Sequence, residues 1–129
     1  MSMNDTTAAA LSKIFNSERL GREYCLVKAS SLIKRILAVL KENNYVGESE
    51  EIYDGKGNIL KVTLLGNINK CGVIKPRFAV TKSGYEKFEK RFLPAKDFGI
   101  LIISTSKGIM THLEAKKKNI GGKLLVYCY

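Results

Sequence analysis

A short run of small hydroxyl side chains has the clearest chemical capacity in the sequence. It directly follows the apolar segment Gly99–Ile103 and consists of Ser104, Thr105, Ser106, Lys107 and Gly108. A serine or threonine hydroxyl both donates and accepts hydrogen bonds, glycine allows close backbone approach, and lysine supplies a positive charge. The minor groove of A-form RNA presents 2′-hydroxyls and base edges that also donate and accept. We therefore predict a loop that contacts the sugar edges of folded RNA.

A structural interpretation of the same run stays open. Small hydroxyl residues also satisfy backbone donors in turns and at helix starts. Thr111 and Glu114 have the spacing of a capping box, which predicts a helix over 111–118. In this alternative the run only connects the apolar strand to that helix, and its hydroxyls bind the chain itself.

Basic and aromatic side chains near the run extend the candidate surface. The lysine run at 116–118 and the nearby Lys123 predict phosphate contacts, for which we single out Lys116, Lys117 and Lys123. At helical spacing these lysines also fit a solvated helix face. Tyr85 is a candidate for stacking on a base or a sugar, with a core position as the alternative.

Two helix starts in the first half of the chain supply further candidates. Asn4 and Asp5 begin the first expected helix. The second start contains Ser30, Ser31 and Lys34. Backbone N–H groups at a helix start bind phosphate, so both places are predicted to meet RNA. Simple capping of each helix by its polar side chains is the better supported interpretation.

The positive charge is concentrated in the second half of the chain. The 129 residues contain 22 Lys and Arg and 12 Asp and Glu, which gives a formal net charge of +10. Of these, 9 basic and 8 acidic residues lie before Gly66, so the remaining 13 and 4 lie after Leu65. So uneven a segment attracts polyanions such as nucleic acids, although many basic proteins merely have a solvated surface. The charge supports an RNA partner without requiring one.

Other functional classes find little support in the sequence. Lys107 follows the hydroxyl residues, which is the wrong order for a phosphate-binding P-loop, and no serine lies in a nucleophile elbow. The single histidine, His112, is expected on the surface of a short helix and has no His or Cys at ligand spacing, and no acid-base pair can be assembled from the sequence. We therefore predict no enzyme, no metal site and no cofactor. The 3 cysteines predict buried thiols in a reducing compartment. No apolar run is long enough to cross a bilayer, which predicts a soluble protein without a membrane partner.

The spacing of apolar residues predicts an α+β fold of two small packed subdomains. The N-terminal subdomain, residues 1–66, has the order α-β-α-β-β. Its expected elements are a helix over 4–20, a strand over 22–28, a helix over 30–42 and strands over 45–53 and 59–65. The C-terminal subdomain, residues 67–129, is mainly β with short helices. Its expected elements are a short strand that begins at Cys71 and ends at Pro76, a helix at 83–93, a buried strand at 99–103, a helix at 111–118 and a strand at 124–129.

The order of these motifs resembles the small-subunit ribosomal protein eight family over essentially the whole chain. The resemblance rests on the segment Gly99–Thr111, on Glu114-Ala115 and on the double glycine Gly121-Gly122. The segment Asn69–Phe78 is more similar to the archaeal and eukaryotic branch of the family than to the bacterial branch.

The resemblance implies a structural constituent of the small ribosomal subunit. Such a protein is a primary rRNA-binding protein that docks on a helix of the central domain of small-subunit rRNA and aids its assembly. The main RNA-contacting loop of the family falls on residues 104–108, and the first helix start and the segment Lys28–Lys34 correspond to regions near the same RNA. The resemblance also implies neighbouring small-subunit ribosomal proteins as partners, a monomer outside the ribosome and a cytoplasmic location.

Three other functions remain as alternatives at this point. A free regulator that binds messenger RNA would share the RNA chemistry but would not sediment with ribosomal subunits. A protein-interaction module would have no salt-sensitive affinity for RNA. An enzyme acting on small phosphorylated molecules would show turnover.

Overall fold

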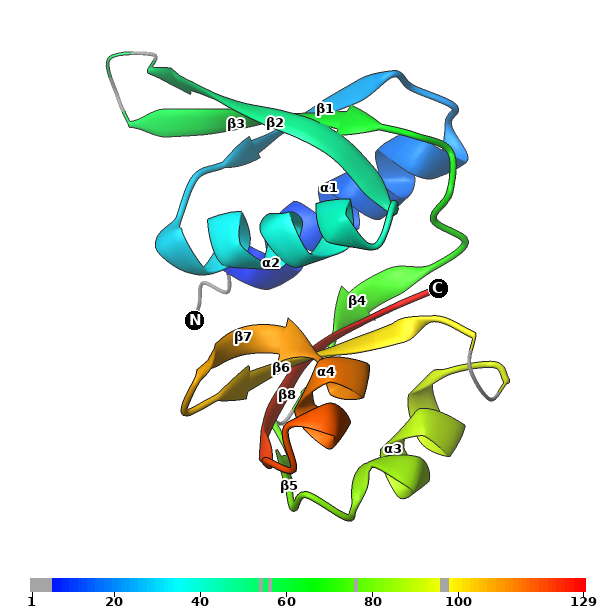
Figure 1. Ribbon diagram of the computed structural model, residues 1–129. Helices are drawn as coiled ribbons and strands as arrows, with labels where there is room; N and C mark the ends of the chain where they lie inside the picture. Colours follow the sequence, from blue (N-terminus) through cyan, green and yellow to red (C-terminus); the bar gives the residue numbers. More distant parts are fainter. Residues whose placement is uncertain (1–5, 54, 56, 76, 96–97) are drawn as a thin grey trace. The chain divides into compact units, whose positions relative to one another are not determined.

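The chain divides into two units, Met1–Ile68 and Asn69–Tyr129 (Figure 1). The computed structural model describes residues 6–53, 55, 57–75, 77–95 and 98–129. Each unit combines helices with one antiparallel sheet, so the predicted α+β class is confirmed. Among the described residues, none of the helices has the length and apolar character needed to span a membrane.

The first unit has two helices on one face of a three-stranded sheet (Figure 1). Its elements are α1 (Thr6–Arg19), β1 (Tyr24–Lys28), α2 (Ser31–Glu42), β2 (Val46–Tyr53) and β3 (Asn58–Leu64). Strand β3 lies between β1 and β2. Alternate residues of β1 are buried and exposed, as a strand with one covered face requires. The predicted order α-β-α-β-β is confirmed.

The second unit is built around the strand order β4-β8-β6-β7, with β5 also paired to β8. Its strands are β4 (Cys71–Val73), β5 (Ala79–Val80), β6 (Ile100–Thr105), β7 (Gly108–Thr111) and β8 (Gly122–Cys128). Its helices are α3 (Tyr85–Phe92) and α4 (His112–Lys117). Residues of both helices join a buried cluster with alternate residues of β6, such as Leu101 and Ile103. The remaining apolar residues of β6, Ile100 and Ile102, are 4% and 0% exposed, so this strand is buried on both faces as predicted.

The structure corrects the expected connection after β6. The hydroxyl run does not lead directly into a helix, because the short strand β7 pairs back along β6 and forms a hairpin with it. Strand β5 was not predicted, and the strand expected from Cys71 to Pro76 is limited to Cys71–Val73. The predicted cap of α4 is present, since the Glu114 N–H donates to the Thr111 hydroxyl at 3.2 Å.

The double glycine allows three strands to meet at the start of β8. A Cβ on Gly121 would lie 2.2 Å from the Val80 carbonyl oxygen, next to β5. A Cβ on Gly122 would lie 2.3 Å from the Ser104 carbonyl oxygen in β6. Both obstacles are backbone atoms that cannot turn aside, so only glycine fits at either position. The hydroxyl run and the double glycine are therefore parts of one close backbone contact.

We expect the substitution Gly122→Ala to lower the free energy of unfolding by about 3 kcal/mol, because the added methyl group must separate β8 from β6. Urea denaturation monitored by circular dichroism measures this loss. Gly84→Ala is the control in the same unit, since its Cβ would meet a movable Thr81 hydroxyl at 3.0 Å. A loss no larger in Gly122→Ala than in Gly84→Ala would contradict the close-contact role.

Candidate nucleic-acid interface

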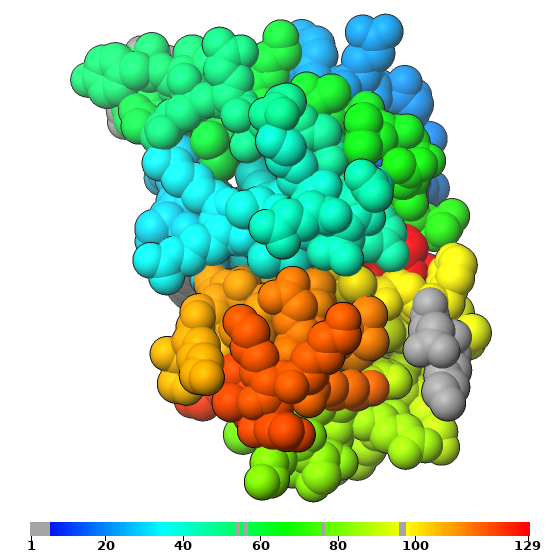
Figure 2. Space-filling view, in the orientation of Figure 1, coloured from blue at the N-terminus to red at the C-terminus, as the bar shows by residue number. Residues whose placement is uncertain are grey.

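The tip of the β6–β7 hairpin presents the hydroxyl run to solvent. Ser104 and Thr105 end β6, Ser106 and Lys107 form the turn, and Gly108 begins β7. Only Thr105 among these residues is partly buried, and the others are exposed. In Figure 2 the hairpin is the orange lobe beside the deeper orange of α4, which contacts both of its strands. The run therefore lies on an accessible surface of the second unit.

The Thr105 hydroxyl holds the turn together. It donates to the Gly108 carbonyl at 2.7 Å and accepts from the Lys107 N–H at 3.1 Å. Gly108 has a φ of 115°, a backbone conformation that other residues rarely adopt. For Thr105, the alternative interpretation is therefore correct: its hydroxyl binds the chain itself. Ser104 and Ser106 make no side-chain hydrogen bond within the described chain, so their hydroxyls remain available to a ligand.

A cation lies next to the hydroxyls on the neighbouring strand. Lys123 of β8 is the register partner of Ser104, so the two side chains lie on the same face of the sheet. On the other side of Ser104, its register partner in β7 is Ile109. Lys107 adds a second exposed charge at the tip. The hairpin tip, defined here as residues 104–108 with Lys123, therefore combines hydroxyls and positive charge.

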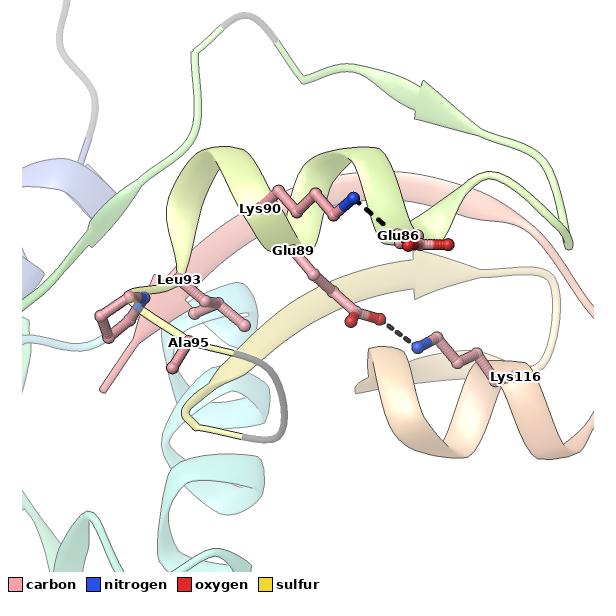
Figure 3. Close-up of a pocket in the computed structure, with 7 residues that line it drawn as sticks. Glu86, Glu89, Lys90, Leu93, Ala95 and Lys116 are labelled. Atoms are coloured by element: carbon pink, nitrogen blue, oxygen red, sulfur yellow. Dashed lines mark ion pairs between the residues drawn. The ribbon is translucent and has the colours of Figure 1, made fainter.

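Lys116 has a different environment from the other predicted phosphate contacts. Its ammonium group forms an ion pair with the carboxylate of Glu89, so α4 is tied to α3 across a pocket of about 450 Å³ (Figure 3). The Glu89 side chain is only 12% exposed. Lys117, the next residue, is exposed. The charge of Lys116 thus compensates a largely buried carboxylate.

The expectation that His112 lies on a helix surface is wrong. Its side chain is 3% exposed, and its Nδ1 accepts a hydrogen bond from the Leu101 N–H at 3.1 Å. Its Nε2 lies 3.6 Å from the Glu89 carboxylate. The buried Ala115 lies one helical turn further along α4, so this spacing was a signal that His112 belongs to the buried face.

The structure places Tyr85 in the core and corrects its assignment to the RNA surface. The side chain is 1% exposed, and its hydroxyl donates to the Ile120 carbonyl at 2.7 Å. Burial raises the pKa of the Tyr85 phenol above its usual value. Packing of an amphipathic helix against the sheet explains the position, because Phe88 in the next turn is also buried. A ring in this place cannot stack on a base.

The second helix start follows the capping interpretation. The Ile33 N–H donates to the Ser30 hydroxyl at 3.2 Å, so Ser30 caps α2. Ser31 is the exposed first residue of the helix. Lys34 forms an ion pair with Glu51 at 3.0 Å, and its hydrogen bond holds the pKa of that carboxyl below the usual value, with help from Asn58. The two candidates at the first helix start, Asn4 and Asp5, lie outside the described residues.

A comparison with known protein families identifies the family of the chain. A family model described as ribosomal protein S8 matches residues 5–129. The chain belongs to the ribosomal protein S8 family. Members of this family are structural, rRNA-binding components of the small ribosomal subunit, and the family is not one of enzymes. Within the described residues of this S8 protein, no three His, Cys, Asp or Glu side chains are grouped so as to hold a metal ion.

In the S8 fold, Lys116 pairs with a largely buried carboxylate, whereas Lys117 and Lys123 have no ion pair among the described residues. We expect Lys116→Ala to lower the free energy of unfolding by about 1–2 kcal/mol, because the largely buried Glu89 carboxylate loses its cation. Lys117→Ala, the control on the same helix, should change stability by no more than about 0.5 kcal/mol. Urea titrations of both variants measure the difference. Equal stability of the two variants would show that the ion pair contributes nothing.

Proposed function

We propose that this S8 protein docks its hairpin tip into the minor groove of an irregular helix in the central domain of small-subunit rRNA. The observation that carries the proposal is the exposure of the Ser104 and Ser106 hydroxyls on a braced hairpin, with Lys123 beside them. Short hydroxyl groups reach 2′-hydroxyls and base edges in a shallow groove, whereas long basic side chains favour phosphates. Shape and sugar recognition would therefore determine specificity.

The support beneath the tip favours this function. Strand β6 is buried on both faces, and Thr105 and Gly108 fix the turn. A backbone that is held in place before binding loses little conformational entropy when its residues meet their ligand. The two serine hydroxyls would thus contribute most of their hydrogen-bond energy to affinity.

Lysines around the tip would supply the electrostatic part of binding. Lys107, Lys117 and Lys123 are exposed, and none of them takes part in an ion pair within the described residues. Lys116 is a weaker candidate, because Glu89 already holds its charge. Ser30, Ser31 and Lys34 stay a second proposed contact, supported by the family resemblance, in which capping and the pair with Glu51 compete with RNA.

The proposal also includes a role in ribosome assembly, a cellular location and an oligomeric state. The protein would bind rRNA as a primary assembly protein, act in the cytoplasm, and be a monomer outside the ribosome. The similarity of the segment Asn69–Phe78 to the archaeal and eukaryotic branch stays a prediction.

Removal of the two exposed hydroxyls tests the proposed recognition. We expect Ser104→Ala with Ser106→Ala to weaken binding to a central-domain rRNA helix by about 2 kcal/mol, or about 30-fold, because two hydrogen bonds are lost. Fluorescence anisotropy measures the affinity and thermal melting measures the stability. Ser83→Ala, at another exposed serine of the same unit, is the matched control and should bind normally. Unchanged affinity in a folded double variant would remove the tip from recognition.

The salt dependence of binding tests the electrostatic part. We expect Lys107→Ala and Lys123→Ala each to reduce the slope of log K against log salt concentration by about 0.7–0.9, since each lysine would neutralise one phosphate. Affinities measured over a range of salt concentrations give this slope. Lys90→Ala is the control, because Lys90 already pairs with Glu86 at 3.4 Å. Slopes that match the unmodified protein would show that these lysines do not contact phosphate.

A further inference from the structure

Two cysteines that the proposed function does not use lie opposite each other on adjacent strands of the second unit. Cys71 in β4 and Cys128 in β8 are register partners. All three cysteines lie within the described residues, and none of them is in a disulfide. The third, Cys25, is paired in register with Val62 in β3. The chain thus offers one pair of opposed thiols and one cysteine without a thiol across from it.

The flanking hydrogen bonds show which kind of cross-strand pair the two cysteines form. Lys70 and Tyr129 exchange both backbone hydrogen bonds, at 3.0 and 2.9 Å. Just beyond β4, the Ile74 N–H donates to the Leu125 carbonyl at 2.9 Å, which continues the register of the β4–β8 pair. Hydrogen-bonded and non-hydrogen-bonded pairs alternate along an antiparallel ladder. Cys71 and Cys128 lie one step from the Lys70–Tyr129 pair, so theirs is a non-hydrogen-bonded pair.

This position suits a disulfide bond. The Cα atoms of a non-hydrogen-bonded pair are about 4.5 Å apart, and the two side chains lie close together on one face. Disulfides span Cα separations of about 4.4–6.8 Å, so a pair of this kind lies within the range that a disulfide bridges. The two residues could be bridged within the existing β4–β8 pairing.

Access of an oxidant follows from the place of Cys71 in the sheet. The cysteines are 6% and 0% exposed, so the closed structure shields both. Strand β4, however, has only three residues and lies at one end of the strand order β4-β8-β6-β7. Short edge strands open locally at much lower free energy than central strands. Cys71 would therefore meet a small oxidant first.

We propose that Cys71 and Cys128 are a redox modification site that forms a reversible cross-strand disulfide with hydrogen peroxide as the oxidant. The Cys71 sulfur attacks peroxide, an S–O bond forms as the O–O bond breaks, and one water leaves. The Cys128 sulfur then attacks the sulfenic acid, an S–S bond forms as the S–O bond breaks, and a second water leaves. The two thiols lose two electrons and peroxide gains them. An added dithiol reverses the step.

The bond would fasten the last residue of β8 to β4 without touching the hairpin tip. Cys128 ends β8, whereas Lys123 lies near its beginning. A bridge restricts the unfolded chain, so the oxidised protein should melt about 5–10 °C above the reduced protein. This consequence is independent of the proposed RNA contact, so failure of one does not affect the other.

The experiment treats the purified full chain with hydrogen peroxide and maps its peptides by mass spectrometry without reduction. We expect an intramolecular link between the Cys71 and Cys128 peptides with the loss of two hydrogen atoms, a raised melting temperature, and reversal of both by dithiothreitol. Cys25→Ala is the matched control and should retain the link. Cys71→Ala and Cys128→Ala should each abolish it, and either one suffices if the other fails to fold.

Three results would overturn the proposal. They are a link that involves Cys25, disulfides only between separate molecules, and thiols that stay reduced or stop at sulfinic acid in the folded protein. A Cys71–Cys128 link that leaves the melting temperature unchanged would contradict the stabilising role given to it.

Discussion

Backbone pairing around β6 is the constraint on which the second unit depends. This strand is buried on both faces, and its hydrogen bonds run to β7 on one side and to β8 on the other. The unpaired N–H and C=O groups of a buried strand are costly, so neither neighbour can be removed without loss of the other. Glycine at position 122 is needed for β8 to approach, and glycine at position 108 is needed for β7 to turn. The exposed hydroxyls thus lie at the end of a strand that is paired on both sides.

The sequence predicted features that depend on local chemistry. The order of elements in the first unit, the doubly buried strand β6 and the cap at Thr111 all follow from apolar spacing or from one side chain meeting a neighbouring N–H group. The hydroxyl run was found for the same reason. Its division into a turn-forming Thr105 and two available serines was not predictable, because the three residues have similar chemistry and differ only in where the hairpin places them.

The errors arose where distant parts of the chain meet. Tyr85 and His112 have amphipathic side chains that suit either a surface or a core, and packing against the β6 sheet places both in the core. For His112 the spacing to Ala115 already indicated the buried face, but this signal is a single pair in a short helix. Lys116 is a typical solvated residue until α3 brings Glu89 against it. Strand β7 is short and ends in the residue that caps α4, so the helix signal concealed it. In each case tertiary contacts outweighed a local preference.

The Glu89–Lys116 pair has a consequence for the distribution of charge. A lysine that compensates a largely buried carboxylate adds little to the field felt by a distant polyanion, because the two opposite charges nearly cancel at distances much longer than their separation. The field around the hairpin tip therefore comes mainly from exposed lysines such as Lys107 and Lys123. Charges on flexible side chains attract RNA of any sequence, whereas in the proposed function the Ser104 and Ser106 hydroxyls on their braced hairpin would discriminate by position. In that proposed function the two roles would lie on different side chains within one surface, so affinity and specificity would vary separately.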